Sequence, residues 1–208
     1  MIIEVIFDVE TKKLFSDIQT DDPGDLGISV MSVYRRVLNS AHEEISGEMV
    51  SYWDPEAGIT PDIALSLPIF SEADRIIGFN SLHFDVPALV PYHGKTFAKL
   101  NHFDIMDIVK NRLGRKLSLN ALATETLGAT KTDVGTNAVL YWAKRDGQSM
   151  EKLQKYCEAD VFLTRDLYDF GMKNNYLRYV DKWNNKTIVE VDFSYPEAPK
   201  PSPQISLL

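Results

Sequence analysis

The segment VIFDVETKK (residues 5–13) places Asp8 and Glu10 two positions apart in an apolar run that predicts a β-strand over Ile2–Val9. Side chains of a strand alternate between the two faces of a sheet, so both acids point to the same face. Two buried carboxylates repel each other and lose hydration, which raises a carboxyl pKa until a proton binds. A divalent cation removes this conflict, and oxygen ligands favour Mg²⁺ or Mn²⁺. The alternative is an edge strand whose two acids face water.

Further strands and helices follow in an order that indicates the fold class. GISVMSVYRRV (residues 27–37) and EMVSYW (residues 48–53) are β-branched and aromatic runs, and with the first strand they predict an antiparallel meander. Strands are also expected over 75–80 and 102–106, and helices over 62–73, 107–113, 118–127 and from Gly147 onward, with Ser149 as the N-cap. Residues 81–90 read as a loop or a helix. This mixture predicts a layered α/β or α+β fold.

The length of 208 residues, with 44% hydrophobic side chains, suits one domain with a substantial core. The last fourteen residues contain four prolines and predict an extended or disordered tail. We therefore expect one domain over residues 1–192 and a proline-rich tail over residues 193–208.

Hydropathy, cysteine content and net charge restrict the cellular compartment and the binding partners that the sequence predicts. No apolar run reaches the ~18 residues of a membrane span, so no membrane partner is expected. The single Cys157 cannot form an internal disulfide, which fits a reducing, cytoplasmic location. A net charge of −8 argues against a broad basic face for duplex DNA, but an acidic metal site remains compatible with nucleic acid.

Two further acids lie in segments that predict burial. Asp85 stands between Phe84 and Val86, five residues after Asn80, which ends a predicted strand. Tyr156 and Asp160 are four residues apart and share one helix face. The alternative for this last pair is a hydrogen bond at the surface. Other acids have structural interpretations: Glu158 and Asp166 in water, and Asp104 and Asp107 as helix caps.

The segments FDVET, NSLHFD and YCEAD, in this order, resemble the three motifs of the DEDD exonuclease superfamily. A tyrosine stands four residues before the last acid, and in this respect the segment resembles the tyrosine-type branch. The histidine-type branch would have histidine where Lys155 stands. The segment 116–142 resembles YprB-like and related bacterial or phage members. The resemblance covers Ile3 to about Leu167. It implies an RNase H-like α/β fold, a mixed sheet of three antiparallel strands followed by parallel strands, flanked by helices.

The resemblance also implies a function: a metal-dependent 3′-5′ exonuclease that acts on single-stranded DNA or RNA ends and releases nucleoside 5′-monophosphates. Four ligands would hold two divalent ions, Mg²⁺ or Mn²⁺, with the first as the bridging acid: Asp8, Glu10, Asp85 and Asp160. Tyr156 would orient the attacking water, because its pKa near ~10 makes it a poor free base. Thr11 and Asn80 are candidate substrate contacts; for Asn80 the alternative is a turn cap.

Several assignments stay open at this stage. Lysines at four positions are candidates for phosphate contacts, with none preferred: Lys12, Lys13, Lys116 and Lys131. Tyr141 and Trp142 either pack in the core or line a cleft where a base could stack. The main alternative function is a catalytically silent RNase H-like module that binds nucleic acid or a protein, although silent relatives are expected to lack at least one of the acids found here. A structural acidic protein is the third reading.

Overall fold

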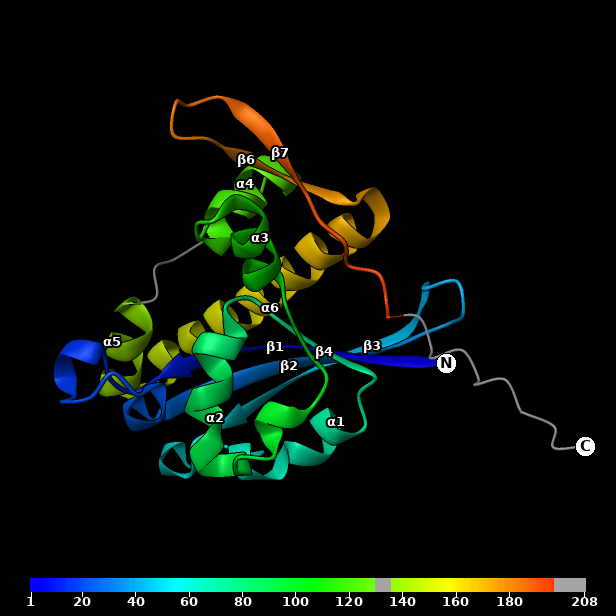
Figure 1. Cartoon of the computed structure of the whole chain (residues 1–208). Coiled ribbons are helices and arrows are strands. Elements are labelled where there is room, and N and C mark those ends of the chain that lie inside the picture. Colours follow the sequence, from blue (N-terminus) through cyan, green and yellow to red (C-terminus); the bar gives the residue numbers. More distant parts are fainter. Residues whose placement is uncertain (130–135, 197–208) are drawn as a thin grey trace, which may run out of the picture.

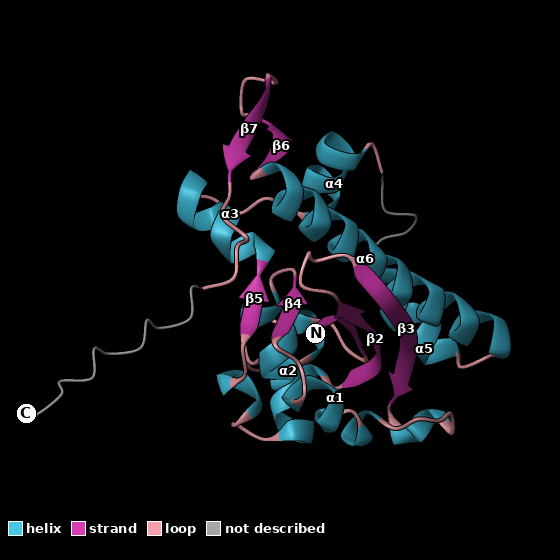
Figure 2. Ribbon diagram, turned by 90° about the vertical axis from the view of Figure 1, so that its right-hand side faces the viewer, coloured by secondary structure: helices cyan, strands magenta, loops and turns pink. Residues whose placement is uncertain are grey.

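A computed structural model of the chain describes residues 1–129 and 136–196. Five strands form one mixed sheet in the order β3-β2-β1-β4-β5. Their bounds are β1 Ile2–Thr11, β2 Ile28–Leu38, β3 Glu44–Trp53, β4 Arg75–Gly78 and β5 His102–Asp104. The first three strands pair antiparallel, whereas β4 and β5 run parallel to β1. The predicted fold class, a mixed sheet flanked by helices, is confirmed (Figure 2).

Helices cover both faces of this sheet (Figures 1 and 2). The six α-helices of the described residues are α1 Leu67–Ser71, α2 Asp85–His93, α3 Ile105–Leu113, α4 Leu119–Leu127, α5 Thr136–Lys144 and α6 Gly147–Asn174. Single-turn 3₁₀ helices occupy residues 15–17, 23–26, 55–57, 63–65, 81–83 and 97–99. A separate hairpin, β6 (Tyr176–Val180) with β7 (Lys186–Glu190), follows α6.

The alternation of β1 decides which side its acids face. Val5, Phe7 and Val9 are buried in a core shared with residues of α1 and α2. Ile6 belongs to the opposite core, which contains α3, α4 and α6. Because strand side chains alternate, Asp8 and Glu10 lie on the same face as Ile6, beneath α6. The two carboxylates therefore face α6, and both stay partly exposed to solvent.

Two sequence predictions about helices need correction. The helix expected over 62–73 is a 3₁₀ turn (Ile63–Leu65) followed by the short α1, which has Pro68 in its first turn where a missing N–H costs nothing. Asp146, not Ser149, is the N-cap of α6: its carboxylate accepts hydrogen bonds from the amide and the hydroxyl of Ser149. Asp104 caps α3 as expected, accepting from two amides of its first turn.

The C-terminal segment packs on the sheet domain at least as far as Tyr195. Phe193 is fully buried and stacks on Tyr168 with ring centroids 5.7 Å apart. The Arg75 guanidinium donates to the carbonyl oxygens of Phe193 and Ser194. The first residues of the predicted tail are thus packed, and residues 197–208 lie outside the described residues. No helix in the described parts of the chain is long and apolar enough to cross a membrane.

Candidate active site

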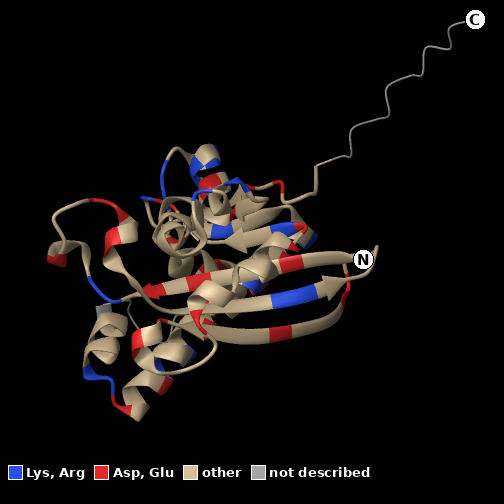
Figure 3. Cartoon of the chain, turned by 90° about the horizontal axis from the view of Figure 1, so that it is seen from below, with Lys and Arg blue, Asp and Glu red and all other residues tan. Residues whose placement is uncertain are grey.

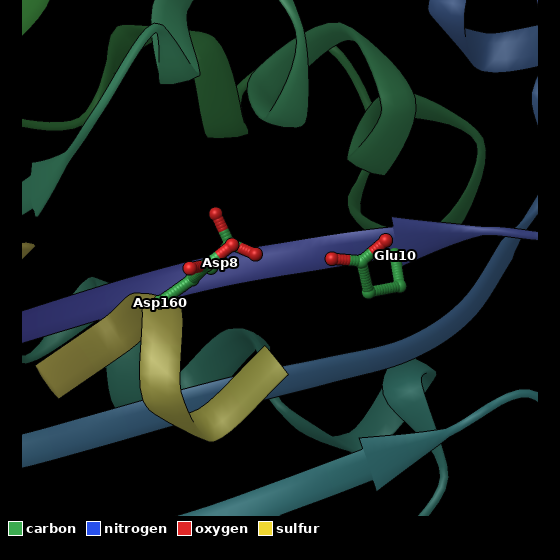
Figure 4. Close-up of side chains that lie close together, drawn as sticks. All are labelled: Asp8, Glu10 and Asp160. Atoms are coloured by element: carbon green, nitrogen blue, oxygen red, sulfur yellow. The ribbon is translucent and has the colours of Figure 1, made fainter. Parts of the chain in front are cut away.

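Three carboxylates meet where β1 passes under α6. Asp8 and Glu10 come from β1 and Asp160 from α6, and one oxygen of each lies within 4.8 Å of the others (Figure 4). Asp160 is only 4% exposed, whereas the two strand acids are partly exposed. Such close acids repel one another, so the group suits a site for a divalent cation. The sequence placed all three residues among the metal ligands, and the structure brings them together.

Cys157 explains how α6 comes so close to β1 at this point. Its side chain is fully buried and its Sγ donates to the carbonyl oxygen of Asp8 at 3.3 Å. Burial, with the nearby charges of Asp8 and Glu10, raises the pKa of the Cys157 thiol well above its ordinary value. The thiol therefore stays neutral, and its small volume allows the close helix–strand contact that places Asp160 beside Asp8.

Asp85 is held beside this group rather than within it. It is the first residue of α2, is 4% exposed, and its Oδ1 accepts the Val9 amide at 3.0 Å. Pairing between β1 and β4 runs only from Glu4 to Ile6, so a side chain can take the Val9 amide farther along the strand. Burial raises the pKa of Asp85 to about 7, and the charges of Asp104 and Asp160 add to the rise.

Tyr156 lies one helical turn before Asp160 on α6, and both side chains are buried there. The Tyr156 ring is 6% exposed and belongs to an apolar cluster with Trp53 and Trp142. Trp142 is therefore a core residue, which decides between the two alternatives left open by the sequence. The packing of the ring fixes the direction in which the phenol oxygen points.

A cavity of about 410 Å³ opens next to the acids. The polar residues of its lining are Asp8, Asn80, Lys116 and Ser118, and the apolar ones are Phe79, Met106, Leu117 and Leu119. Lys116 Nζ donates to Asn80 Oδ1 at 3.3 Å. Asn80 adopts a left-handed conformation (φ 62°), and Asp104 holds its amide at 2.9 Å. Of the three candidate lysines that the structure describes, Lys116 is the one that lines this cavity with Asp8; sequence spacing alone could not select it.

The remaining candidates have local partners. The Thr11 hydroxyl donates to the carbonyl oxygen of Lys13 at 2.8 Å. Lys12 pairs with Asp54 at 2.8 Å, and Lys131 lies outside the described residues. Glu158 was expected in water, but it is half-buried and accepts hydrogen bonds from Ser51 and Gln154. This correction arises because β3 passes next to α6, a contact that a single helix pattern does not reveal.

Comparisons with known proteins agree with this geometry. A sequence profile of the RNase_H superfamily matches residues 5–171. The chain belongs to the RNase_H superfamily. Among solved structures, this RNase_H chain is similar to the family B DNA polymerase from the hyperthermophilic archaeon Pyrobaculum calidifontis, with a TM-score of 0.56 and 16% sequence identity. The match covers 83% of this chain and 25% of the polymerase, so the chain spans about a quarter of that protein. No curated protein matches the sequence.

The acids of this RNase_H superfamily member fit a hard divalent cation. All three donors of the group are carboxylate oxygens, the ligand type that Mg²⁺ and Mn²⁺ prefer. Without a cation, burial and the neighbouring acids raise the pKa of Asp85, so that its protonated form is favoured near neutral pH. A cation would reverse this preference. Cysteine and histidine are absent from the three-residue group, which argues against a zinc site.

Proposed function

We propose that the protein is a metal-dependent 3′-5′ exonuclease of the tyrosine-type DEDD branch, similar to YprB-like and phage members. It hydrolyses single-stranded DNA or RNA from the 3′ end and releases nucleoside 5′-monophosphates. The observation that carries this proposal is the meeting of Asp8, Glu10 and Asp160, from two segments about 150 residues apart, within 4.8 Å. We place this activity in the cytoplasm, in keeping with the single Cys157.

Each site residue has a distinct task in this proposal. Four carboxylates would hold two divalent ions: Asp8 as the ligand shared by both, Glu10 and Asp160 as further ligands of one, and Asp85 as a ligand of the other. Bound Mg²⁺ or Mn²⁺ would supply Lewis-acid activation of water and stabilisation of the leaving 3′ oxygen. Tyr156 orients the attacking water, since its phenol is too weak a base to act alone at neutral pH.

The cavity beside Asp8 is where the terminal nucleotide binds in this proposal. Its apolar walls suit a base, and Lys116 and Asn80 place a cation and an amide at its polar edge for phosphate or sugar oxygens. Thr11 would contact the same nucleotide from the end of β1. Lys116 holds Asn80 in place before substrate arrives, so the polar edge is preorganised.

The test is digestion of single-stranded DNA and RNA, each labelled at the 5′ end, with Mg²⁺ or Mn²⁺ and then with EDTA. We expect a ladder that shortens from the 3′ end only with metal, together with nucleoside 5′-monophosphates. Cuts in closed circular single strands, or products with 3′ phosphates, would contradict the proposal. Binding of the oligonucleotide without cleavage would instead identify a silent module.

Asp8→Ala is the decisive variant for this assay. We expect below about 1% of wild-type cleavage under saturating Mn²⁺, because a bridging ligand is lost. Asp166→Ala is the matched control: it removes an acid from the same helix as Asp160, but one whose side chain is 49% exposed and paired with Arg165. Full activity of the control and loss in Asp8→Ala locate the chemistry at the acidic group.

A further inference from the structure

The β6–β7 hairpin carries a tryptophan that the fold does not use. The hairpin projects from the domain beside α3 and α4 (Figures 1 and 2). Trp183 in its connecting loop is 71% exposed, whereas the other two tryptophans, Trp53 and Trp142, are 2% and 5% exposed. An indole that stays exposed leaves its apolar surface in water, so it forgoes the free energy that burial would supply and contributes little to the core. At a projecting tip, this indole is accessible to a ligand.

The loop that holds Trp183 is well defined by hydrogen bonds. The Asp181 carboxylate accepts the amides of Trp183 and Asn185 at 2.8 and 2.9 Å. The Asp181 amide donates to the Asn185 carbonyl, and the Asn184 amide donates to the Asp181 carbonyl. These bonds fix the backbone on both sides of the tryptophan. The indole is thus presented on a rigid loop, which reduces the conformational entropy lost when a ligand binds.

Charge at the tip favours an anionic ligand. Residues 178–186 contain three basic residues and one acid, in a chain with a net charge of −8. Lys182 Nζ lies 4.4 Å from the centre of the Trp183 ring, and the Arg178 guanidinium lies 5.4 Å from the Tyr176 ring. Lys186 is 84% exposed and 3.2 Å from Glu125. Alternating aromatic and cationic side chains are the usual lining of a single-strand binding surface.

The tip is connected to the candidate active site by a short series of contacts. The Arg115 guanidinium lies over the Tyr179 ring of β6, 5.6 Å from its centre. The next residue, Lys116, lines the cavity that contains Asp8. Basic and aromatic side chains therefore extend from the acidic group to the hairpin. A nucleic-acid strand that leaves the cavity in this direction meets favourable charge along its path.

We propose that the β6–β7 tip is a second contact for single-stranded nucleic acid, in which Trp183 stacks on a base and Lys182 binds the adjacent phosphate. That the 3′ end of the same strand occupies the active site rests on the proposed function. Binding at the tip itself does not, because stacking and phosphate contacts need no metal. The contact would lie upstream of the terminal nucleotide and would retain the substrate between cleavage steps.

Tryptophan fluorescence tests the proposal without cleavage. The protein in EDTA is titrated with an unlabelled 20-nucleotide single-stranded DNA, and emission is recorded with and without iodide. Because Trp183 is the exposed one of three tryptophans, we expect saturable quenching of emission and protection from iodide, both weakened by salt. Unchanged emission and iodide access at concentrations where a labelled strand is bound would overturn the proposal.

Variants at the tip provide the second measurement. We expect Trp183→Ala to weaken binding of a labelled 20-mer about 5- to 100-fold, and Trp183→Phe to retain part of the affinity. Ile45→Ala, which removes a 59% exposed apolar side chain at the start of β3, is the matched control and should bind as wild type. Equal affinity of Trp183→Ala and wild type would refute the contact. Lys182→Gln should weaken binding as well and reduce its salt dependence.

Cleavage kinetics separate this inference from the proposed function. With a 20-mer, Trp183→Ala should raise KM at unchanged kcat, while cleavage of a dinucleotide stays at the wild-type rate. If the wild-type protein cleaves neither substrate, the proposed nuclease activity fails, and the binding measurements still decide the role of the tip. If cleavage is normal and Trp183→Ala has no effect on either length, the nuclease assignment stands and the tip contact is wrong. Melting curves of each variant verify the fold.

Discussion

At the residue scale, the face of β1 under α6 holds acids in two different settings. Glu4 is fully buried and accepts hydrogen bonds from Arg36 Nε at 2.8 Å and from the Tyr168 hydroxyl at 2.9 Å. Farther along the strand, Asp8 and Glu10 lie close to a third carboxylate, that of Asp160. Figure 3 shows acidic residues along β1 and basic ones on β2. The negative charge of Glu4 is therefore balanced by the Arg36 guanidinium, whereas the acids at positions 8 and 10 form a group that suits a bound cation.

Tyr156→Phe separates a positioning role of the phenol from packing of its ring. The variant keeps the ring within the Trp53 and Trp142 cluster and removes only the oxygen. Water-orienting groups contribute about 10²- to 10⁴-fold in rate, so we expect turnover to fall by about 10- to 1000-fold. Single-turnover cleavage of a 3′-terminal nucleotide measures this loss.

Mn²⁺ titration and a melting curve on Tyr156→Phe are the controls, and neither should change. Wild-type cleavage by the variant would make Tyr156 a packing residue and would remove the mechanistic basis of the tyrosine-type assignment. Loss of metal binding or of the fold would show that the phenol has a structural role instead.

His93 predicts a defined pH dependence of stability. Burial lowers the pKa of His93, although its bond with the Ile63 carbonyl acts in the opposite direction. The unfolded state then binds a proton more readily than the folded state. The contribution of His93 to the free energy of unfolding is therefore fully present above the unfolded pKa of ~6.5, and it is lost as the pH falls below that value. Between pH 7.5 and 5.5 the loss amounts to at most about 1.4 kcal/mol.

His93→Phe tests this assignment, because it preserves an aromatic ring beside Phe70 and Phe97. Urea unfolding of wild type and variant at both pH values gives the difference that belongs to His93. Asp85, whose pKa is raised to about 7, changes stability in the opposite direction in the same window, so the total pH slope alone is not informative. An identical pH dependence in the two proteins would contradict the buried, neutral imidazole.

At the element scale, the sequence predicts the sheet better than its surroundings. The three first strands and their antiparallel order follow from β-branched runs and alternation, which are local signals. The hairpin over 176–190 was not predicted, although its aromatic and β-branched runs flank a polar, asparagine-rich turn that could have revealed it. The helix α5 was also missed. The contact between Asp85 and Val9 could not be predicted, because it depends on where β4 stops pairing with β1.

The C-terminal segment packs against α6 at Gly171, where the absence of a side chain leaves room for the Phe193 ring. A Cβ at this position would lie 2.1 Å from Cε2 of Phe193, which is too close for any real contact. Phe193→Ala should lower the free energy of unfolding by about 3–5 kcal/mol, since a fully buried ring is lost. Gly171→Ala should also destabilise the wild type by about 1–3 kcal/mol through overpacking, despite its better helix propensity.

A double-mutant cycle measured by urea unfolding decides whether these two positions are coupled. In the Phe193→Ala background the clash is absent, so Gly171→Ala should become stabilising by up to about 1 kcal/mol. A sign reversal between the two backgrounds is the expected result. If Gly171→Ala has the same effect in both, the packing of the C-terminal segment against α6 is wrong.

At the scale of the whole molecule, the C-terminal segment is joined through Tyr195 to β1, at the end of the strand far from the acidic group. Tyr195 donates its hydroxyl to Glu4 at 2.5 Å, and its ring lies 3.6 Å from the Arg75 guanidinium carbon. Strand β1 therefore has a structural end, tied to the C-terminal segment, and an acidic end under α6. The contacts that hold the C-terminal segment and the proposed metal site thus lie in different parts of one strand, so substitutions can change one without the other.

This separation predicts how metal affects the stability of the whole protein. A cation that binds only the folded state stabilises it by about 2.7 kcal/mol at a concentration 100-fold above Kd. For a chain of this size that corresponds to a rise in Tm of about 5–10 °C. We expect Mn²⁺ to raise the Tm of the wild type and of Asp166→Ala equally, and EDTA to reverse the rise. Asp8→Ala should show no rise, because it lacks a carboxylate of the proposed metal site.

In EDTA, Asp8→Ala should melt at or above the wild-type temperature, since one of three mutually repelling carboxylates has been removed. The two results together distinguish a metal site from a structural cluster. A cluster that served the fold would lose stability in Asp8→Ala without metal, as the loss of Glu4 from its arginine and tyrosine partners would. A Tm of the wild type that does not respond to Mn²⁺, with Asp8→Ala strongly destabilised in EDTA, would show that the acids hold the structure together and that the proposed metal centre is wrong.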